Sequence, residues 1–230
     1  MTSNIPVIEQ ILSANDRLAA MNQSLLDASG TVAMNMMASP GAGKTSVILR
    51  TIEGLNARAK NGRFPLAVIE GDTALTSIDA DKVLAAGMPA VQINTGGQCH
   101  LDASMLGSGL AQLALEEAQL LIVENVGNLV CPAAFDIGTH FNIVIASVPE
   151  GDDKPYKYPQ IYRGIDALIL NKTDLLPYID FDIDYFQRGI QMLNPDATIF
   201  PLSCKTDEGM GAWLDWLAER VASGQVASSE

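Results

Sequence analysis

The sequence ASPGAGKT at residues 38–45 follows an apolar run at 31–37 and decides the fold of this chain. A glycine-bearing turn between a buried strand and a helix presents several backbone N–H groups to a phosphate. Gly41 and Gly43 let the chain curl around an anion because they carry no Cβ atom. A helix opening near Lys44 adds the positive end of its dipole to the same place. This stretch therefore predicts a phosphate-binding loop.

Two side chains complete the predicted loop. Lys44 is expected to reach the β- and γ-phosphates and to act in catalysis, and the Thr45 hydroxyl is expected to ligate Mg²⁺. Ala38 stands where the usual G-x-x-x-x-G-K-[ST] pattern has its first glycine, but Pro40-Gly41 can still form the turn. An incidental glycine-containing loop is the alternative, and the flanking strand and helix argue against it. The predicted nucleotide contacts here are Gly41, Ala42, Gly43, Lys44, Thr45 and Ser46.

A second motif, N-K-T-D at 171–174, follows another apolar strand and indicates which base is bound. A carboxylate only accepts hydrogen bonds, so Asp174 matches the ring N–H and the exocyclic amine of guanine, a pair that adenine lacks. Lys172 is expected to lie over the base, and Asn171 to brace the phosphate loop. With the phosphate-binding loop, this motif predicts GTP and GDP as ligands. The next strand ends at three residues predicted to offer a backbone N–H to the guanine carbonyl: Ser203, Cys204 and Lys205.

Acidic residues follow two further predicted strands. Glu124 is predicted to hold Mg²⁺, and Gly127 to offer its N–H to the γ-phosphate. Asp72 is predicted to be both a Mg²⁺ ligand and a catalytic residue, and Asp79 a second catalytic residue. For each aspartate taken alone, a solvated loop position is an equally good interpretation. No glutamine is evidently placed to orient the attacking water, so a low intrinsic rate of GTP hydrolysis is expected.

Composition narrows the setting. The 230 residues are enough for one sizeable core, and 48% of them are hydrophobic. A net charge of −13 argues against nucleic acid or an anionic membrane as the main partner. No apolar stretch approaches the length of a bilayer span, and no secretory signal is evident at the start. Three cysteines, an odd number, favour a reducing cytoplasm.

Apolar and amphipathic segments alternate along the chain. Continuous apolar strands between helices predict an α/β fold: one P-loop NTPase domain at 31–222, with a mostly parallel sheet of about seven strands covered by helices on both faces. An amphipathic helix within residues 1–30 is expected to pack on this domain, and the tail at 223–230 to be disordered. The predicted strands are 31–37, 66–70, 90–93, 120–124, 142–147, 166–170 and 198–202. The helices are expected at 6–29 and near 44–59, 79–86, 101–118, 180–193 and 209–222.

Cysteine and histidine, the rarest ionisable residues here, suggest a metal site. Cys99 and His100 are adjacent after a predicted strand, and Cys131, held extended by the following proline, lies seven residues beyond Glu124. Thiolate and imidazole suit Zn²⁺ or Ni²⁺, and three ligands leave a tetrahedral position for water, a second subunit or a client. Spacing alone leaves this interpretation open beside another, in which Cys131 is a small buried hydrophobe and His100 precedes a helix. The remaining histidine and cysteine, His140 and Cys204, are interpreted as structural.

Four long motifs resemble those of a known family. They are INTGGQCHLDASM (93–105), IVENVGNLVCPAAFDIG (122–138), SVPEGDDKPYKYP (147–159) and NKTDLLPYIDFD (171–182). These stretches are similar to the HypB-type accessory proteins, the nickel-incorporation GTPases of [NiFe]-hydrogenase maturation, which belong to the SIMIBI class of P-loop GTPases. The similarity runs from about Val32 to Leu217, nearly the whole chain.

The resemblance implies a GTP-hydrolysing metallochaperone that dimerises with GTP and delivers nickel. It implies Ni²⁺ or Zn²⁺ binding at Cys99, His100 and Cys131, and a contact of Lys154 across the dimer. The implied partners are a small HypA-type nickel chaperone and the hydrogenase large subunit. Many members carry an N-terminal cysteine motif or histidine-rich tract, but no Cys or His precedes Cys99, so tight nickel storage is not expected.

Three other functions compete with this one. A urease-type nickel GTPase would carry its metal ligands in a Cys-Pro-His motif, which this sequence lacks. A small-molecule P-loop kinase would need an arginine-rich lid and would leave the motif at 171–174 unexplained. A metal carrier in which the nucleotide only stabilises the fold is consistent with the sequence. Single-turnover GTP hydrolysis with and without nickel distinguishes that carrier from a GTPase.

Overall fold

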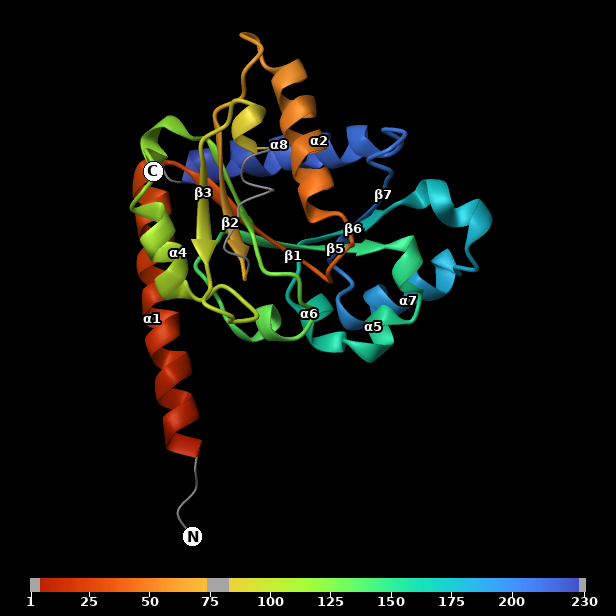
Figure 1. Ribbon diagram of the computed structural model, residues 1–230, viewed down its shortest axis with the longest axis horizontal. Coiled ribbons are helices and arrows are strands. Elements are labelled where there is room, and N and C mark those ends of the chain that lie inside the picture. Colours follow the sequence, from red (N-terminus) through yellow and green to blue (C-terminus); the bar gives the residue numbers. More distant parts are fainter. Residues whose placement is uncertain (1–4, 74–82, 228–230) are drawn as a thin grey trace.

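A seven-stranded sheet forms the centre of the molecule, with the strand order β3-β2-β4-β1-β5-β6-β7 (Figure 1). The computed structural model describes residues 5–73 and 83–227. Every neighbouring pair of strands is parallel. The predicted fold class, strand number and strand direction are therefore confirmed. The strands are β1 (Val32–Ala38), β2 (Leu66–Asp72), β3 (Ala90–Asn94), β4 (Leu120–Glu124), β5 (Phe141–Ser147), β6 (Ala167–Asn171) and β7 (Thr198–Pro201).

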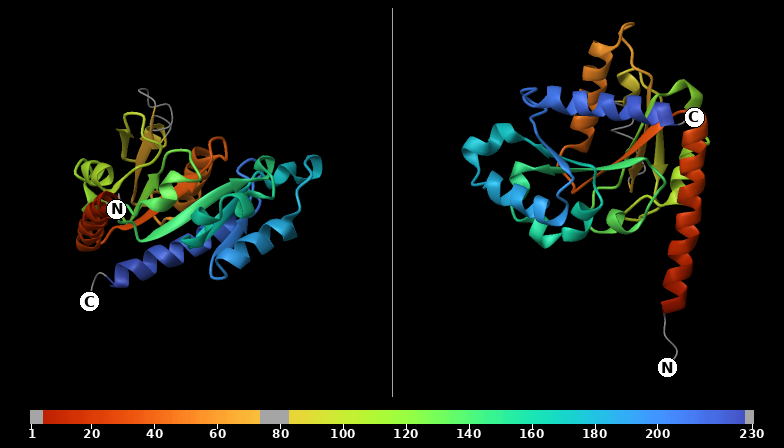
Figure 2. Two further views of the ribbon diagram at one scale, coloured as in Figure 1. Left: turned by 90° about the horizontal axis from the view of Figure 1, so that it is seen from below. Right: turned by 180° about the vertical axis from the view of Figure 1, so that it is seen from behind.

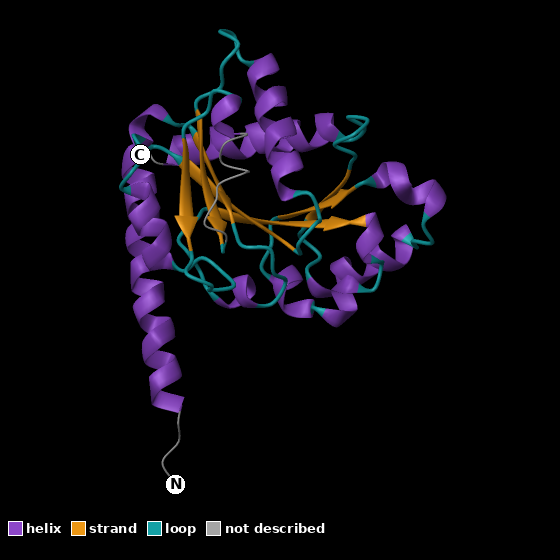
Figure 3. Cartoon of the chain, viewed as in Figure 1, coloured by secondary structure: helices purple, strands orange, loops and turns teal. Residues whose placement is uncertain are grey.

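Helices cover both faces of this sheet (Figures 2 and 3). The α-helices are α1 (Ile5–Ser29), α2 (Lys44–Arg58), α4 (Ala103–Leu110), α5 (Lys154–Lys157), α6 (Pro159–Arg163), α7 (Ile183–Leu193) and α8 (Met210–Ala227). The 3-10 turns are η1 (Leu115–Glu117), η2 (Cys131–Ala134), η3 (Val148–Glu150) and η4 (Thr173–Tyr178). No helix within the two described ranges is long and apolar enough to cross a membrane.

Strand β1 shows why helices must cover both faces of the sheet, because all seven of its residues are buried. Val32, Met34 and Met36 point into one hydrophobic cluster, which also holds apolar side chains of α2 and α8. Ala33 faces the opposite side, in a cluster with residues of α1 and α4, and Met37 faces a third cluster with residues of α6 and α7. Side chains that alternate along a strand thus supply cores to two layers of helices.

The N-terminal helix α1 is attached to the domain by two buried asparagines. Asn15 and Asn22 are each 7% exposed, and both bond the backbone at the start of α4 and in the segment after η2. The rest of α1 runs past the sheet, as Figure 1 shows at the lower left. The predicted packing of an N-terminal helix on the domain therefore has a specific polar basis.

A substitution at Gly138 tests how closely α1 packs on the domain. Its φ is +88°, and a Cβ built there would lie 2.1 Å from the Ala19 carbonyl oxygen in α1. We expect Gly138→Ala to lower the free energy of unfolding by about 3 kcal/mol, through backbone strain and overpacking. Urea denaturation measures this loss. Gly164→Ala is the matched control because its Cβ would meet nothing within 4 Å. Equal stabilities of the two variants would contradict the close seating of α1.

Two segment predictions differ from the structure, and most of a third lies outside the described residues. The helix expected near 101–118 is split into α4 and η1, because Asp102 caps a later start and Gly107 and Gly109 lower helix propensity before the chain turns. The helix expected near 180–193 begins at Ile183, where the Asp182 side chain caps it. Most of the helix expected near 79–86 lies outside the described residues.

The tail also differs from its prediction, since α8 continues to Ala227 where disorder was expected from 223 onward. A Cβ on Gly224 would lie 2.6 Å from Cγ2 of Val32, so this helix turn packs closely against the start of β1. A small residue at that place keeps the helix in contact with the sheet. Residues 228–230 lie outside the described ranges.

Candidate nucleotide and metal sites

The predicted phosphate-binding loop joins the end of β1 to the start of α2. Gly41 and Gly43 adopt φ values of +80° and +102°, which side chains rarely tolerate. Two side chains from the end of β6 hold this loop: Asn171 Nδ2 donates to the Ala42 carbonyl at 3.0 Å, and Lys172 Nζ donates to the Gly41 carbonyl at 2.7 Å. A Cβ on Gly43 would lie 2.5 Å from Asn171 Nδ2, so only glycine fits.

A pocket of about 610 Å³ lies beside the loop, where a base would bind. Asp174 is at its edge and accepts a hydrogen bond at 2.7 Å from the Ser203 hydroxyl, which is fully buried. Ser203 thus orients the carboxylate and does not itself line the pocket. The lining residues are Gly43, Ser46, Leu49, Arg50, Glu53, Asn171, Lys172, Asp174, Leu175, Cys204 and Lys205.

All three backbone N–H groups predicted to meet the guanine carbonyl have partners within the protein. The Ser203 N–H donates to the Glu208 carbonyl at 2.9 Å, the Cys204 N–H lies 3.4 Å from Asn171 Oδ1 at the end of β6, and the Lys205 N–H donates to Ser203 Oγ at 3.2 Å. The Arg50 side chain donates to the Cys204 carbonyl at 2.9 Å, which fixes this loop to α2. Burial raises the pKa of the Cys204 thiol to about 11, so the thiol stays protonated at neutral pH.

A second pocket, of about 290 Å³, is lined by two of the predicted acidic residues, Asp72 and Glu124, together with Glu70. Glu70 and Glu124 are register partners at the ends of β2 and β4, and both are 6% exposed. The Thr45 hydroxyl donates to Glu124 Oε1 at 3.3 Å. Such hard oxygen donors beside a lysine fit Mg²⁺ with a phosphate. The lining residues are Pro40, Lys44, Glu70, Gly71, Asp72, Thr73, Glu124, Asn125, Val126 and Gly127. Asp79 lies outside the described residues.

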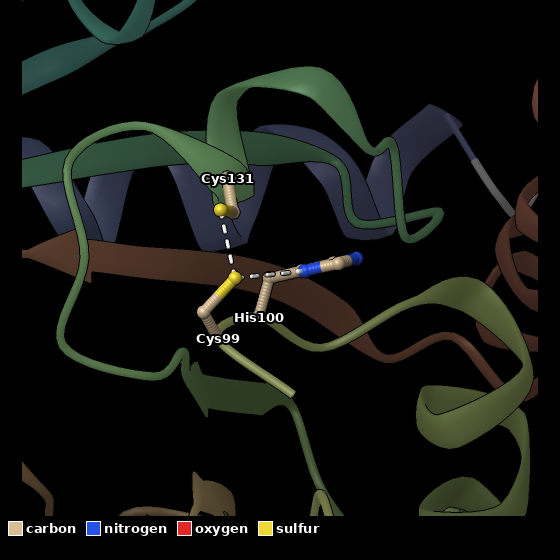
Figure 4. A group of neighbouring side chains, drawn as sticks. All are labelled: Cys99, His100 and Cys131. Carbon is tan, nitrogen blue, oxygen red and sulfur yellow. Dashed lines mark hydrogen bonds between the residues drawn. The ribbon is translucent and has the colours of Figure 1, made fainter. Parts of the chain in front are cut away.

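Cys99, His100 and Cys131 come together on the loops that follow β3 and β4 (Figure 4). One ligand atom of each lies within 4.8 Å of the others. The two Sγ atoms are 2.7 Å apart, and Cys99 Sγ is 3.8 Å from His100 Nδ1. Two sulfurs and one imidazole form a partial tetrahedral set, which suits Zn²⁺ or Ni²⁺. Cys131 opens the 3-10 turn η2, so the extended conformation expected before Pro132 is wrong.

The surroundings set the protonation of these ligands. The hydrogen bond to Cys131, and then burial, raise the pKa of Cys99, because both favour its protonated thiol over the thiolate. Burial lowers the pKa of His100, whose ring stacks on Phe135 with centroids 4.1 Å apart. A lowered pKa keeps this imidazole neutral, which is the form that binds metals.

Asn125, which sequence reasoning overlooked, connects the two sites. It follows Glu124 directly, is 1% exposed, and its Oδ1 accepts from the backbone N–H groups of Leu101 at 3.0 Å and Val126 at 2.9 Å. Leu101 is the residue after His100. A second link is Asn128 Nδ2, which donates to the Cys99 carbonyl at 3.2 Å. The only signal in the sequence was the asparagine pair flanking Gly127, and amides in loops usually read as turn formers.

Glu150 is the other overlooked residue. Its carboxylate accepts from the hydroxyl of Ser39, in the phosphate-binding loop, and from the backbone N–H and hydroxyl of Ser147. Burial raises the pKa of Glu150. Lys154, predicted to act across a dimer, has its Nζ 5.3 Å from the centroid of the Tyr158 ring. The sequence analysis singled out the segment 147–159 as a family motif, and within it only Lys154 was given a role.

His140, interpreted as structural, lies away from the metal ligands in a different environment. Its Nδ1 accepts from the Ala33 backbone N–H at 2.9 Å, and its Nε2 is 3.0 Å from the Asp27 carboxylate. Both ring nitrogens therefore connect β1 and the end of α1. The three cysteines are free thiols.

A parallel sheet with a phosphate-binding loop, a base pocket and an acidic pocket at its carboxyl edge defines a P-loop GTPase. The comparisons with known proteins agree. Residues 32–201 match the family model "CobW/HypB/UreG, nucleotide-binding domain". The hydrogenase maturation factor HypB of Azotobacter vinelandii is 51% identical over 211 residues, which cover 91% of this chain and 68% of the relative. The chain therefore belongs to the CobW/HypB/UreG family, in its HypB group of hydrogenase maturation factors.

Two solved structures of this group share the whole architecture. HypB from Helicobacter pylori in complex with nickel is 38% identical with a TM-score of 0.84, and the match covers 92% of this chain and 97% of that one. HypB from Archaeoglobus fulgidus is 37% identical with a TM-score of 0.83, over 91% of this chain and 100% of that one.

Proposed function

We propose that this protein is a GTP-hydrolysing metallochaperone that binds Ni²⁺ or Zn²⁺ and delivers nickel during [NiFe]-hydrogenase maturation. The observation that carries the proposal is the gathering of Cys99, His100 and Cys131, with ligand atoms within 4.8 Å, beside a nucleotide site. The nickel complex of the Helicobacter pylori relative supports it. Three ligands leave one position open, and an open site suits a cargo ion that must be passed on.

The nucleotide roles follow from the two pockets. Asp174 accepts from guanine, Lys172 lies over the base, and Ser203 orients the carboxylate. Gly41 to Ser46 surround the phosphates, with Lys44 and Gly127 at the terminal one. Thr45, Asp72 and Glu124 would hold Mg²⁺, which neutralises phosphate charge when bound. Asp72 and Asp79 are the proposed catalytic carboxylates. None of the described residues lining the acidic pocket is a glutamine, in keeping with a low intrinsic rate.

Coupling between the nucleotide and the cargo runs through the loop after β4. A Cβ on Gly127 would lie 3.3 Å from Pro40, so this loop touches the phosphate-binding loop. On its other side, Asn125 and Asn128 bond the backbone of the segment that carries Cys99 and His100. A γ-phosphate that draws in Gly127 therefore also shifts the segments that hold the thiols. Hydrolysis removes that contact and lowers the affinity of the site for the metal ion.

Assembly completes the proposal. GTP favours a homodimer in which Lys154 reaches the partner protomer, and a HypA-type chaperone and the hydrogenase large subunit exchange the metal with it in the cytoplasm. Mass measurements in the nucleotide-free, GDP-bound and GTP-analogue-bound states, each with and without Ni²⁺, test this arrangement. A dimer fraction that is the same in all six samples would refute GTP-dependent dimerisation.

Nucleotide control of the metal site gives a direct prediction. We expect Ni²⁺ to bind about tenfold more tightly with a non-hydrolysable GTP analogue than with GDP, within the usual coupling range of about 1–3 kcal/mol. Competition with a chromophoric chelator measures both affinities. Equal affinities would rule out nucleotide control. Single-turnover hydrolysis, with and without Ni²⁺, separates this GTPase from a carrier in which nucleotide only stabilises the fold.

A further inference from the structure

Two asparagines of α1 contact both chain segments that carry the metal ligands. Asn15 Oδ1 accepts from the Ala103 backbone N–H at 3.0 Å, and its Nδ2 donates to the Asp136 carbonyl at 2.7 Å. About two turns further along the same face of α1, Asn22 Nδ2 donates to the Ala103 carbonyl at 2.8 Å and to the Ile137 carbonyl at 3.0 Å. Each amide thus joins the same two segments.

These segments are direct continuations of the ligand positions. Ala103 lies three residues after His100, and Asp136 and Ile137 lie five and six residues after Cys131. Between them and the ligands, the chain is held by the Asp102 cap of α4 and by the stacking of His100 on Phe135. A shift of either segment relative to the other therefore changes the separation of the two thiols.

Close packing makes the position of α1 specific. A Cβ on Gly107 in α4 would lie 2.9 Å from Asn22 Oδ1, and one on Gly138 would lie 2.9 Å from Asn22 Cβ. Both ligand-bearing segments thus use glycine where they meet α1. The amides are buried, so removing either one leaves backbone groups without partners and the segments free to separate.

We propose that Asn15 and Asn22 are positioning residues of the metal site, which hold the two ligand-bearing segments at the spacing that Cys99, His100 and Cys131 require. This inference rests on the proposed function for the identity of the cargo, but the spacing itself is measurable without any metal. The asparagines touch no ligand atom, and they act through the backbone of Ala103, Asp136 and Ile137.

Thr31→Ala provides a matched control in the short connection between α1 and β1. Thr31 is 2% exposed, and its hydroxyl donates to the Leu115 and Ala118 carbonyls at 2.7 and 3.0 Å. Its loss removes the same kind of buried contact between the N-terminal segment and the domain, but Leu115 and Ala118 carry no metal ligand. A role in stability alone predicts equal behaviour of the threonine and asparagine variants.

The first experiment measures thiol proximity in the metal-free chain. Diamide takes up two electrons and two protons as the thiols of Cys99 and Cys131 join in a disulfide, and peptide mass spectrometry follows the product. We expect Asn15→Ala and Asn22→Ala to slow this reaction about tenfold, which corresponds to about 1.4 kcal/mol, and Thr31→Ala to leave the rate unchanged. Asn15→Ala, which also removes two hydrogen bonds, carries the test alone if Asn22→Ala does not fold. Equal rates in all variants would overturn the inference.

The second experiment measures Ni²⁺ and GDP affinities of the same variants. We expect about tenfold weaker Ni²⁺ binding in the asparagine variants, with GDP affinity and the Thr31→Ala values unchanged. If the unsubstituted protein binds no Ni²⁺, the proposed function fails while the disulfide rates still decide on the positioning. If it binds Ni²⁺ and the asparagine variants match Thr31→Ala, only the positioning role fails.

Discussion

Replacing Asp174 by asparagine lowers the affinity of the protein for GDP about a thousandfold, because two charge-assisted hydrogen bonds to guanine are lost. The buried Ser203 hydroxyl holds the side chain in place at 2.7 Å, so the amide remains at the same position. Asparagine presents an N–H donor to the second purine position, where xanthine carries a carbonyl. We therefore expect xanthosine diphosphate to bind the variant more tightly than GDP does. Equilibrium titration with both nucleotides measures this change in base preference.

Asp184→Asn is the control for this substitution. Asp184 is an exposed residue in the first turn of α7, and it does not line the base pocket. Its variant should bind GDP like the unsubstituted protein. If Asp174→Asn also keeps its GDP affinity, Asp174 does not read the base and the assignment of the pocket is incorrect.

The second large effect concerns the cargo site, where Cys131→Ser should weaken Ni²⁺ binding at least about a hundredfold. Losing a side chain that only orients a ligand already costs about 10–100-fold, and this change removes a thiolate ligand itself. Cys131 also lies 2.7 Å from the Cys99 sulfur, so the pair acts as a unit. Charge-transfer absorption from sulfur to Ni²⁺ should fall with the affinity. Chelator competition and this absorption band provide independent measurements.

His140→Gln is the control for this substitution, because it removes an imidazole that is not part of the proposed metal site. His140 is bonded to Ala33 and Asp27, so its loss should leave Ni²⁺ affinity unchanged. Retention of full affinity and of the sulfur band in Cys131→Ser would place the metal elsewhere in the protein. A loss of affinity in His140→Gln as large as in Cys131→Ser would point to a change of the whole domain.

The sheet could be predicted from the sequence because its signals are local. Each strand is a short apolar run, and parallel pairing follows from the helices that separate the runs. Boundaries were less well predicted where long-range contacts decide them. The end of α4 depends on glycines that approach α1 and β2, and α8 extends to Ala227 because Gly224 packs against Val32. Such contacts join residues far apart in the sequence.

The functional residues show the same contrast between local sequence signals and long-range contacts. The phosphate-binding loop and the N-K-T-D motif are each contiguous in the sequence, and most of their residues line one of the two pockets. Asn125 and Glu150 were overlooked because their partners are distant: Asn125 is 24 residues from Leu101, and Glu150 is 111 residues from Ser39. The residues around Asn125 and Glu150 in the sequence do not indicate their roles, because the fold alone brings their partners near. The meeting of Cys99 with Cys131, 32 residues apart, needed the resemblance to a known family.

The bracing of the phosphate-binding loop by Asn171 and Lys172 has a kinetic consequence. Both side chains bond the loop's carbonyls directly, so contacts within the protein itself set the shape of the loop. Preorganisation of this kind spares the ligand the entropy of ordering a glycine-rich turn. We therefore expect different purine nucleotides to associate at similar rates and to differ mainly in their dissociation rates.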